Sequence, residues 1–367
     1  IALGHRRLSI QDLSPAGHQP MESASGRYVV AYNGEIYNHL DLRKELEKPS
    51  SGGSGARRWR GHSDTETLLA AIDTWGIETS LKRCVGMFAF ALWDRQERVL
   101  TLARDRLGEK PLYYGWQGKS FLFGSELKAL RQHPEWKNEV NRDVLALFMR
   151  HNYVPSPYSI YQGVYKLPPG TMLHLRAGAV PGTIPEPEAY WSATDTVMQG
   201  LAHPFTGSEG EAVDALESLL LETIGDKMIS DVPLGAFLSG GYDSSLVVAL
   251  MQARSERPVR TFSIGFHEEG YNEAHHAAAV AAHLGTEHSE LYVTPEQAMA
   301  VIPDLPRIYD EPFADSSQIP TFLVSRLARE QVTVSLSGDG GDELFGGYNR
   351  YAQGRMLMQR LGRLPAP

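Results

Sequence analysis

A short polar segment, SGGYDSS at residues 239–245, has the residue types that hold a phosphate group. It follows one apolar run, 233–238, and precedes another, 246–251, so we predict a buried strand, a loop and the start of a helix. The N–H groups and hydroxyls of such a loop lie at the positive end of the helix, where phosphates bind. Asp243 adds a carboxylate, which favours a divalent cation between it and the phosphates.

A glycine-rich turn without a ligand is the alternative interpretation of this loop. Its position between a predicted strand and a predicted helix favours the phosphate site over the plain turn. The loop is not a Walker A motif, because no Gly-Lys-Ser/Thr follows it, and the G-x-G-x-x-G dinucleotide pattern is absent.

A second loop, SGDGGDE at 337–343, follows another apolar run, 332–336. Its carboxylates, Asp339, Asp342 and Glu343, would repel one another without a cation or a basic partner. An acidic turn that caps a helix is the alternative. Two such loops, each closing a strand of one sheet, predict ATP with its pyrophosphate bound through Mg²⁺ and attack at the α-phosphorus.

A third polar loop, 309–317, also precedes a predicted helix. Its polar side chains are Asp310, Glu311, Asp315, Ser316 and Ser317. Substrate binding and simple helix capping are both compatible with this composition.

The second half of the chain alternates between helical and strand patterns. We predict helices at 211–228, 244–254, 272–284 and 318–330, and strands at 233–238, 259–266, 287–293 and 332–336. Alternation of this kind is typical of a parallel sheet with helices on both faces. Ligands of such sheets bind at the C-terminal ends of the strands, where the two Ser-Gly loops are predicted to lie.

The first half is predicted to be richer in strands. A strand at 28–32 runs into Asn33-Gly34, a turn dipeptide, and a helix is expected at 65–75. Further predicted elements are paired strands at 87–93 and 99–103, a hairpin formed by 112–116 and 120–123, and a flexible surface excursion at 49–61. Prolines concentrate at 176–210, where we place an interdomain linker.

The bulk composition narrows the classes of function. A chain of 367 residues suits two domains, and 42% hydrophobic with 22% charged residues is typical of a globular protein. A net charge of −9 argues against nucleic-acid binding as the main function. We expect no membrane span and no signal peptide, and the single cysteine, Cys84, fits the reducing cytoplasm. The start at Ile1 and the end in LPAP, 364–367, predict a fragment cut at both ends.

The second half resembles the synthetase domain of glutamine-hydrolysing asparagine synthetases, an ATP-pyrophosphatase (PP-loop) fold. The resemblance rests on DVPLG at 231–235, the 239–245 loop, FSIGF at 262–266 and the run 337–348. The first half is similar to the class II glutamine amidotransferase domain of the same family. That likeness rests on GHRRLSI at 4–10, NGEIYN at 33–38, SDTE at 63–66 and RDRLG at 104–108.

The resemblance implies two domains with different folds. Residues 1–175 would form an α+β, αββα domain of the N-terminal-nucleophile (Ntn) hydrolase type, and 211–367 an α/β domain with a parallel sheet. It implies a ligase of amino-acid biosynthesis that binds glutamine, aspartate and ATP with Mg²⁺, and it allows a homodimer.

The resemblance also implies a glutamine site made of Arg7, Ile10, Asn33, Gly34, Glu35 and Asp64. Arg7 would bind the glutamine carboxylate, and Glu35 with Asp64 the amino group. Asn33 and Gly34 would form the oxyanion hole, since a side-chain amide and a backbone N–H are suitable donors. The family's nucleophile is an N-terminal cysteine, which this sequence lacks; Cys84, among apolar neighbours, is predicted to be a core residue.

In the second half, the implied adenosine site consists of Phe237 or Leu238, Ile264, Ser337 and Gly338. The implied site for pyrophosphate and Mg²⁺ consists of Ser239, Gly240, Gly241, Asp243, Ser244 and Asp342, with Asp243 and Asp342 as metal ligands. Asp339 matches a position tied to forming β-aspartyl-AMP. Tyr242 departs from the family, which usually carries an aliphatic residue there, and the family's catalytic lysine is expected beyond Pro367.

The implied reaction is the conversion of ATP, aspartate and glutamine into asparagine, glutamate, AMP and diphosphate. Two alternatives stay open. A related ligase could amidate a sugar acid or a peptide carboxylate. A non-catalytic homologue could sense glutamine or ATP: the missing cysteine favours that interpretation, and the retained carboxylates Asp243, Asp339, Asp342 and Glu343 oppose it.

Overall fold

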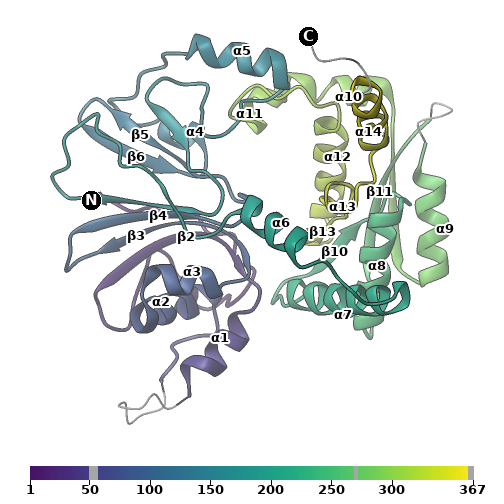
Figure 1. Ribbon diagram of the computed structural model, residues 1–367, viewed down its shortest axis with the longest axis horizontal. Helices are drawn as coiled ribbons and strands as arrows, with labels where there is room; N and C mark the ends of the chain where they lie inside the picture. Colours follow the sequence, from purple (N-terminus) through teal and green to yellow (C-terminus); the bar gives the residue numbers. More distant parts are fainter. Residues whose placement is uncertain (49–56, 268–271, 363–367) are drawn as a thin grey trace. The chain divides into compact units, whose positions relative to one another are not determined.

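The computed structural model of the chain describes residues 1–48, 57–267 and 272–362 (Figure 1). Much of the predicted excursion at 49–61 and the terminal run 364–367 lie outside these residues. The chain divides into two compact units, Ile1–Ala212 with Pro303–Ser316, and Val213–Ile302 with Ser317–Pro367. Each unit is described by itself.

The first unit contains two antiparallel sheets with the strand orders β1-β2-β3-β4-β8-β9 and β6-β5-β7. Its strands are β1 (Met21–Glu22), β2 (Tyr28–Ile36), β3 (Gly86–Asp94), β4 (Val99–Arg104), β5 (Tyr113–Gln117), β6 (Ser120–Gly124), β7 (Val164–Lys166), β8 (Thr171–Arg176) and β9 (Glu188–Ala189). Its helices include η1 (Pro15–Gly17), α1 (His39–Leu46), α2 (Asp64–Trp75), α3 (Ile77–Arg83), α4 (Leu127–Leu130), α5 (Arg142–His151), α6 (Ala193–Ala202) and α11 (Leu305–Ile308).

These elements form four layers, which the buried clusters define (Figure 1). Successive side chains of a strand point to opposite faces, so Phe88 and Phe90 of β3 pack with α2 and α3, whereas Ala89 of β3 packs with Tyr114 of β5. On the outer face of the second sheet, Tyr113 packs against Leu127 of α4. The order helix, sheet, sheet, helix confirms the predicted αββα fold.

The predicted turn at Asn33-Gly34 is wrong. Strand β2 continues to Ile36, and Asn33 and Gly34 pair with Ala89 and Phe88 of β3. Glycine is needed at this position because the backbones of β2 and β3 lie close together: a Cβ at Gly34 would lie 2.6 Å from the Phe88 Cα. The dipeptide therefore lies inside the sheet, on strand β2, which lines the cavity of the first unit.

Most other elements predicted for this half are confirmed, including α2, the β3–β4 pair and the β5–β6 hairpin. Helix α2 begins where Ser63 Oγ accepts a hydrogen bond from the Glu66 N–H at 3.2 Å.

The stretch proposed as a linker, 176–210, contains β9, which pairs with β8. Next to β9, the buried Tyr190 donates its hydroxyl to the Arg104 carbonyl at 2.7 Å, so part of this stretch packs in the first unit.

The second unit is a parallel sheet in the order β12-β11-β10-β13, with helices on both faces, as predicted. Its strands are β10 (Leu234–Phe237), β11 (Arg260–Phe266), β12 (Glu287–Val293) and β13 (Val334–Leu336). The helices of this half of the chain are α7 (Glu209–Lys227), α8 (Tyr242–Arg254), α9 (Ala274–Leu284), α10 (Pro295–Met299), η2 (Ile302–Asp304), α12 (Gln318–Arg329), α13 (Gly341–Phe345) and α14 (Asn349–Leu361).

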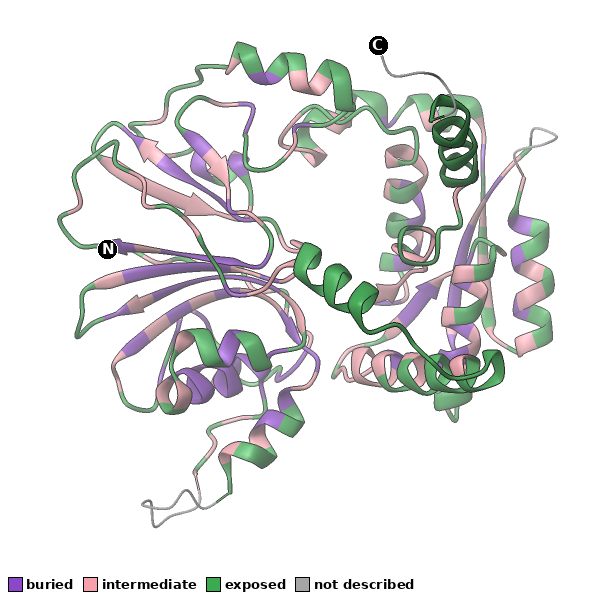
Figure 2. Cartoon of the chain, in the orientation of Figure 1, coloured by how far each residue is buried: buried purple, intermediate pink, exposed green. Residues whose placement is uncertain are grey.

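Two buried clusters fix these helices on the sheet. Val248 of α8 and Ala277 of α9 pack on one face with Ala236 of β10. Val324 of α12 packs on the other face with Phe262 of β11. Figure 2 shows the strands mostly buried or half-buried, and α14 exposed along its length.

The strand order places a switch point between β10 and β13. The chain steps outward from β10 through β11 to β12 and returns on the other side of β10, where Ala236 pairs with Leu336. In open parallel sheets, ligands bind beyond the C-terminal ends of the strands at such a point. The two Ser-Gly loops follow these two strands directly. Among the described helices, none has the length and apolar character to cross a membrane.

Candidate functional site

A cavity of about 650 Å³ lies at the C-terminal ends of β10 and β13. The sequence-predicted residues that line it are Phe237, Leu238, Ser239, Gly241, Asp243, Ser244, Ile264, Ser337, Gly338, Asp339 and Asp342. Gly240 does not line it, but its φ of 82° lets the loop turn at a value that favours glycine. The structure thus brings together almost the whole predicted nucleotide site.

The first loop folds on itself through its serine hydroxyls. Ser239 Oγ and Ser244 Oγ are 2.9 Å apart, and Ser239 Oγ accepts a hydrogen bond from the Gly241 N–H at 3.3 Å. Helix α8 begins directly afterwards, with Gly241 as its N-cap and no side-chain cap. The first N–H groups of this helix are therefore left for an anion, and the helix dipole favours one there.

The second loop lies directly on the first. A Cβ at Gly338 would be 2.6 Å from the Ser244 nitrogen and 3.0 Å from the Asp243 Cβ. Only glycine permits this approach of the two backbones. Within the second loop, Ser337 donates its hydroxyl to Asp339 Oδ2 at 3.0 Å, which holds this carboxylate at the cavity.

The oxygen ligands at this cavity fit a magnesium ion. Asp243 and Asp342 both line it, and Mg²⁺ is usually held by one or two carboxylates together with substrate phosphates. In the described parts of the chain, no group of three or more His, Cys, Asp or Glu side chains could hold a metal ion by itself. Two carboxylates at one cavity fit a cation that is also bound by the phosphates of a nucleotide.

Tyr242, the departure from the family pattern, is 96% exposed at the first position of α8. Its ring lies on the solvent side of the cavity, so it does not separate the two loops.

The sequence motifs did not predict other lining residues, including Glu273 near α9 and Pro320 and Thr321 of α12. The polar loop 309–317, which leads into α12, was the one sequence feature that pointed to Pro320 and Thr321.

A second cavity, of about 670 Å³, lies in the first unit. All six residues of the predicted glutamine site line it: Arg7, Ile10, Asn33, Gly34, Glu35 and Asp64. They come from the N-terminal segment, from β2 and from the start of α2. Another part of the lining is the segment that joins β6 to α4, including Ser125 and Glu126.

Asn33, the proposed oxyanion donor, is held by a residue of this segment. Asn33 Nδ2 donates to Ser125 Oγ at 3.1 Å, which fixes the orientation of the amide. Arg7 is also fixed, because its Nη2 donates to the carbonyls of Gln11 and Asp12 at 2.6 and 2.9 Å. The sequence motifs could not predict these hydrogen bonds of Asn33 and Arg7, because they carry no information on side-chain orientation.

Asp64 is 6% exposed and accepts several hydrogen bonds within the unit. Its Oδ2 accepts from the Tyr32 hydroxyl and from the Ile36 N–H, each at 2.9 Å, and its Oδ1 accepts from the Thr65 N–H at 2.7 Å. Burial, and then the neighbouring Asp64 carboxylate, raise the pKa of Tyr32 well above its ordinary value, so Tyr32 stays a donor. Asp64 thus joins α2 to β2 at the cavity wall.

Cys84 is not part of this cavity. It is 2% exposed in the core between β2, β3 and the helices α2 and α3, and burial raises its pKa to about 12. A thiol of that pKa is not a nucleophile at neutral pH. The prediction that Cys84 is a core residue is confirmed.

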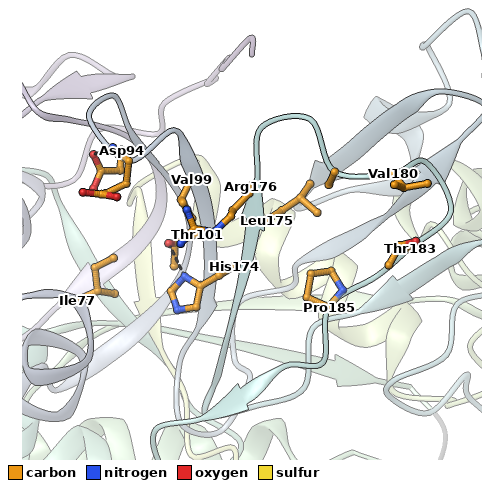
Figure 3. A pocket seen from close by; sticks show the side chains of 12 residues that line it. Ile77, Asp94, Val99, Thr101, His174, Leu175, Arg176, Val180, Thr183 and Pro185 are labelled. Carbon is orange, nitrogen blue, oxygen red and sulfur yellow. Dashed lines mark hydrogen bonds between the residues drawn. The ribbon is translucent and has the colours of Figure 1, made fainter.

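A third cavity, of about 630 Å³, contains none of the predicted residues (Figure 3). Thr101 of β4 and His174 of β8 face each other there, with Oγ1 and Nδ1 2.9 Å apart, among aliphatic groups such as Leu175, Val180 and Pro185. The candidate sites are the other two cavities, because they hold the residues predicted from the motifs.

Comparison with known proteins matches two family models, one after the other along the chain. Residues 1–191 match the family model of the glutamine amidotransferase domain, and residues 215–367 match that of asparagine synthase. A Methanocaldococcus jannaschii protein, provisionally named asparagine synthetase [glutamine-hydrolyzing] 2, is 36% identical over all of this chain and 70% of its own length.

Two further relatives agree. Asparagine synthetase [glutamine-hydrolyzing] 1 of Bacillus subtilis is 36% identical over all of this chain and 54% of its own length. Asparagine synthetase B [glutamine-hydrolyzing] of Escherichia coli is 32% identical over 94% of this chain and 56% of its own length. The chain therefore spans between about half and 70% of the length of these curated relatives.

Proposed function

Because the chain belongs to the glutamine-hydrolysing asparagine synthetase family, we propose that the protein of which it is part makes asparagine from aspartate, ATP and glutamine. The other products would be glutamate, AMP and diphosphate. The observation that carries the proposal is the pair of adjoining Ser-Gly loops at the switch point of the parallel sheet, in a chain that also has a glutamine-site cavity. An ATP-dependent amidation needs a site that binds the phosphates of ATP and a source of ammonia.

In the cavity of the first unit, we assign Arg7 to the glutamine α-carboxylate and Glu35 with Asp64 to the α-ammonium group. Asn33 Nδ2 and the Gly34 N–H would stabilise the negative oxygen that forms when the side-chain amide is attacked. The single cysteine of the sequence is buried, so glutamine hydrolysis needs a nucleophile that these residues do not supply. Glutaminase activity is therefore proposed for the whole protein.

In the cavity at the ends of β10 and β13, the two Ser-Gly loops would bind ATP, with adenosine against Phe237 or Leu238, Ile264, Ser337 and Gly338. Pyrophosphate would lie on the first loop and the N-terminus of α8. Asp243 and Asp342 would hold Mg²⁺, which offsets negative charge on the phosphates when bound. The serine hydroxyls and N–H groups orient the same phosphates by donating hydrogen bonds.

The proposed chemistry has two steps. An oxygen of the aspartate side-chain carboxylate bonds to the α-phosphorus, and the bond from that phosphorus to pyrophosphate breaks, which gives β-aspartyl-AMP. Ammonia then bonds to the acyl carbon and loses a proton, while the carbon–oxygen bond to AMP breaks. Asp339, held by Ser337, is assigned to the first step, near the reacting carboxylate.

The test uses the full-length protein with aspartate, ATP and either glutamine or ammonium. We expect AMP and diphosphate in equal amounts, together with asparagine. ADP and phosphate as products would overturn the proposal. Replacing aspartate by glutamate, a sugar acid or a peptide carboxylate, and measuring AMP release, then identifies the acceptor: aspartate should give the highest kcat/KM.

A further inference from the structure

One edge of strand β2 borders the cavity of the first unit and is covered by β1 along part of its length. The pairing of β1 with β2 reaches Met21 opposite Val30. Pro20, the residue before β1, has no N–H and cannot continue the ladder as a donor. Backbone groups farther along this edge of β2, from Tyr32 onward, therefore need partners other than a strand.

The side chain of Gln19 takes the place of β1 opposite Tyr32. The antiparallel register that pairs Met21 with Val30, continued by two residues, brings Gln19 opposite Tyr32. There the Gln19 Oε1 accepts a hydrogen bond from the Tyr32 N–H at 2.7 Å. Gln19 is 8% exposed and Tyr32 2% exposed, and both line the cavity. The amide of Gln19 is thus a buried part of the cavity wall.

Asp64 has the same relationship to this edge two positions beyond Gly34. Its Oδ2 accepts the Ile36 N–H at 2.9 Å. The same oxygen accepts the Tyr32 hydroxyl at 2.9 Å, so the two ends of this stretch of β2 are also joined to each other. Side-chain oxygens therefore bind the backbone N–H groups on either side of Gly34.

The Gly34 N–H lies between these two hydrogen-bonded groups. Backbone N–H groups of alternate residues in a strand point to the same edge, so the Gly34 N–H points to the edge of Tyr32 and Ile36. Tyr37, which is out of phase with them, donates instead to the Val85 carbonyl at 2.8 Å, on the side of β3. Gly34 lines the cavity, and its N–H is the backbone donor of the proposed oxyanion hole.

We infer that Gln19 is a positioning residue of this oxyanion hole: by binding the Tyr32 N–H, it keeps the edge of β2 where the Gly34 N–H points into the cavity. The activity part of the inference rests on the proposed hydrolysis of glutamine. Gln19 acts through the backbone of β2 and needs no contact with glutamine. Without its oxygen, the buried Tyr32 N–H would be unpaired, a costly state that a shift of the strand or an entering water would relieve.

The test compares two variants of Gln19 in the full-length protein. Gln19→Met keeps the length of the side chain but replaces the amide oxygen by a thioether, a weak acceptor. Gln19→Glu keeps an acceptor oxygen at the same distance along the chain. Gln19→Asn, whose amide is one methylene too short to reach Tyr32, replaces Gln19→Met if that variant does not fold.

The matched control is Gln117→Met on β5. Gln117 is 4% exposed, and its Oε1 accepts the Lys137 N–H at 2.9 Å, so it makes the same kind of buried bond as Gln19. It belongs to the same unit but lies outside the set of residues that line this cavity. Its replacement should cost stability without affecting the oxyanion hole.

Two readouts are measured. Hydrogen exchange of the Tyr32 N–H, followed by mass spectrometry, should become at least about tenfold faster in Gln19→Met and stay unchanged in Gln117→Met. The kcat for glutamine hydrolysis should fall about tenfold in Gln19→Met, because a small displacement of a donor is costly in the transition state. The KM for glutamine should stay within about twofold, since the oxyanion forms only after binding. Gln19→Glu should restore most of the kcat, and ammonium-dependent synthesis should not change.

Unchanged exchange at Tyr32 in a folded Gln19→Met or Gln19→Asn protein would overturn the inference. So would faster exchange with an unchanged kcat, or a higher KM at an unchanged kcat, which would make Gln19 a residue for substrate binding. An equal loss of kcat in Gln117→Met would assign the effect to stability and contradict the positioning role. If the wild-type protein releases no glutamate from glutamine, the proposed function fails, and the exchange experiment still decides whether Gln19 holds the edge of β2.

Discussion

Gly341 lies against the carboxylate of Asp243, so that a Cβ at this glycine would come within 2.5 Å of Asp243 Oδ2. The two residues belong to loops that follow different strands, β13 and β10. The contact is with a side chain and not with backbone, so a substitution would displace the carboxylate before it disturbs the fold. The approach of the second loop thus fixes where the proposed metal ligand points.

We expect Gly341→Ala to weaken ATP–Mg²⁺ binding at least tenfold, which is about 1.4 kcal/mol, because Asp243 must turn away. Titration calorimetry with a non-hydrolysable ATP analogue measures this in the full-length protein. Gly354→Ala is the matched control: this glycine is in α14 with nothing within 4 Å of its Cβ position, and alanine there should leave binding unchanged. Equal affinities for wild type and Gly341→Ala would contradict the assignment of Asp243.

A second prediction concerns the oxyanion hole. Asn33→Ala should lower kcat for glutamine hydrolysis by about 10²–10³, the usual effect of losing one such donor, and leave ammonium-dependent synthesis unchanged. Ser125→Ala keeps the amide but removes its 3.1 Å hydrogen bond, so a smaller loss is expected. Steady-state assays of glutamate release and AMP release separate the two activities. A parallel loss of both activities in Asn33→Ala would point to unfolding instead.

The fold was largely predictable because its signals are local. Alternating strands and helices in the second half gave the parallel sheet, and the apolar pattern located α2, β3 and β4. The prediction of a turn at Asn33-Gly34 was wrong because turn propensity depends on the dipeptide alone and takes no account of β3, the strand that pairs with it. Only the approach of Phe88 shows that this glycine serves sheet pairing.

The sites were predictable only in part. The residue types of the loops at 239–245 and 337–343 indicate phosphate and metal binding by themselves, and both loops line the cavity at the ends of β10 and β13. Ser125 and Thr321 reach their cavities through tertiary packing, which no local spacing encodes. The ties of Glu311 to Lys166 and Tyr113 join residues far apart in the sequence, so a single sequence could not reveal them.

The buried thiol gives a third prediction. Because its pKa is raised to about 12 and it is buried among apolar side chains, Cys84 should resist iodoacetamide in the folded protein at pH 8. It should react fully after denaturation in guanidinium chloride. Mass spectrometry of the peptide containing Cys84 measures both states. Rapid modification of the folded protein would show that this part of the core opens, and would contradict the core assignment.

The last prediction is a pH dependence of stability that comes from Asp94. Its carboxylate is 10% exposed and binds Arg27 through Nε and Nη2, with Nη2 2.6 Å from Oδ2, and it also accepts from the Gln96 and Glu97 N–H groups. Burial acts to raise the pKa of Asp94, but these hydrogen bonds outweigh it and the pKa is lowered. A carboxyl group whose pKa is lower in the folded state stabilises the fold above its unfolded pKa of about 3.9, and this contribution is lost as the pH falls through the folded value.

Asp94→Asn should therefore lower the free energy of unfolding by about 2 kcal/mol at pH 7, and the difference from wild type should shrink below about pH 4. Thermal unfolding at several pH values, followed by circular dichroism, gives the comparison. Glu22→Gln is the control in the same region, since its ion pair with Arg95 is exposed on both sides and solvent screens it. A difference for Asp94→Asn that stays constant down to pH 2, or one matched by Glu22→Gln, would show that the Arg27–Asp94 charge pair does not stabilise this end of β2 and β3.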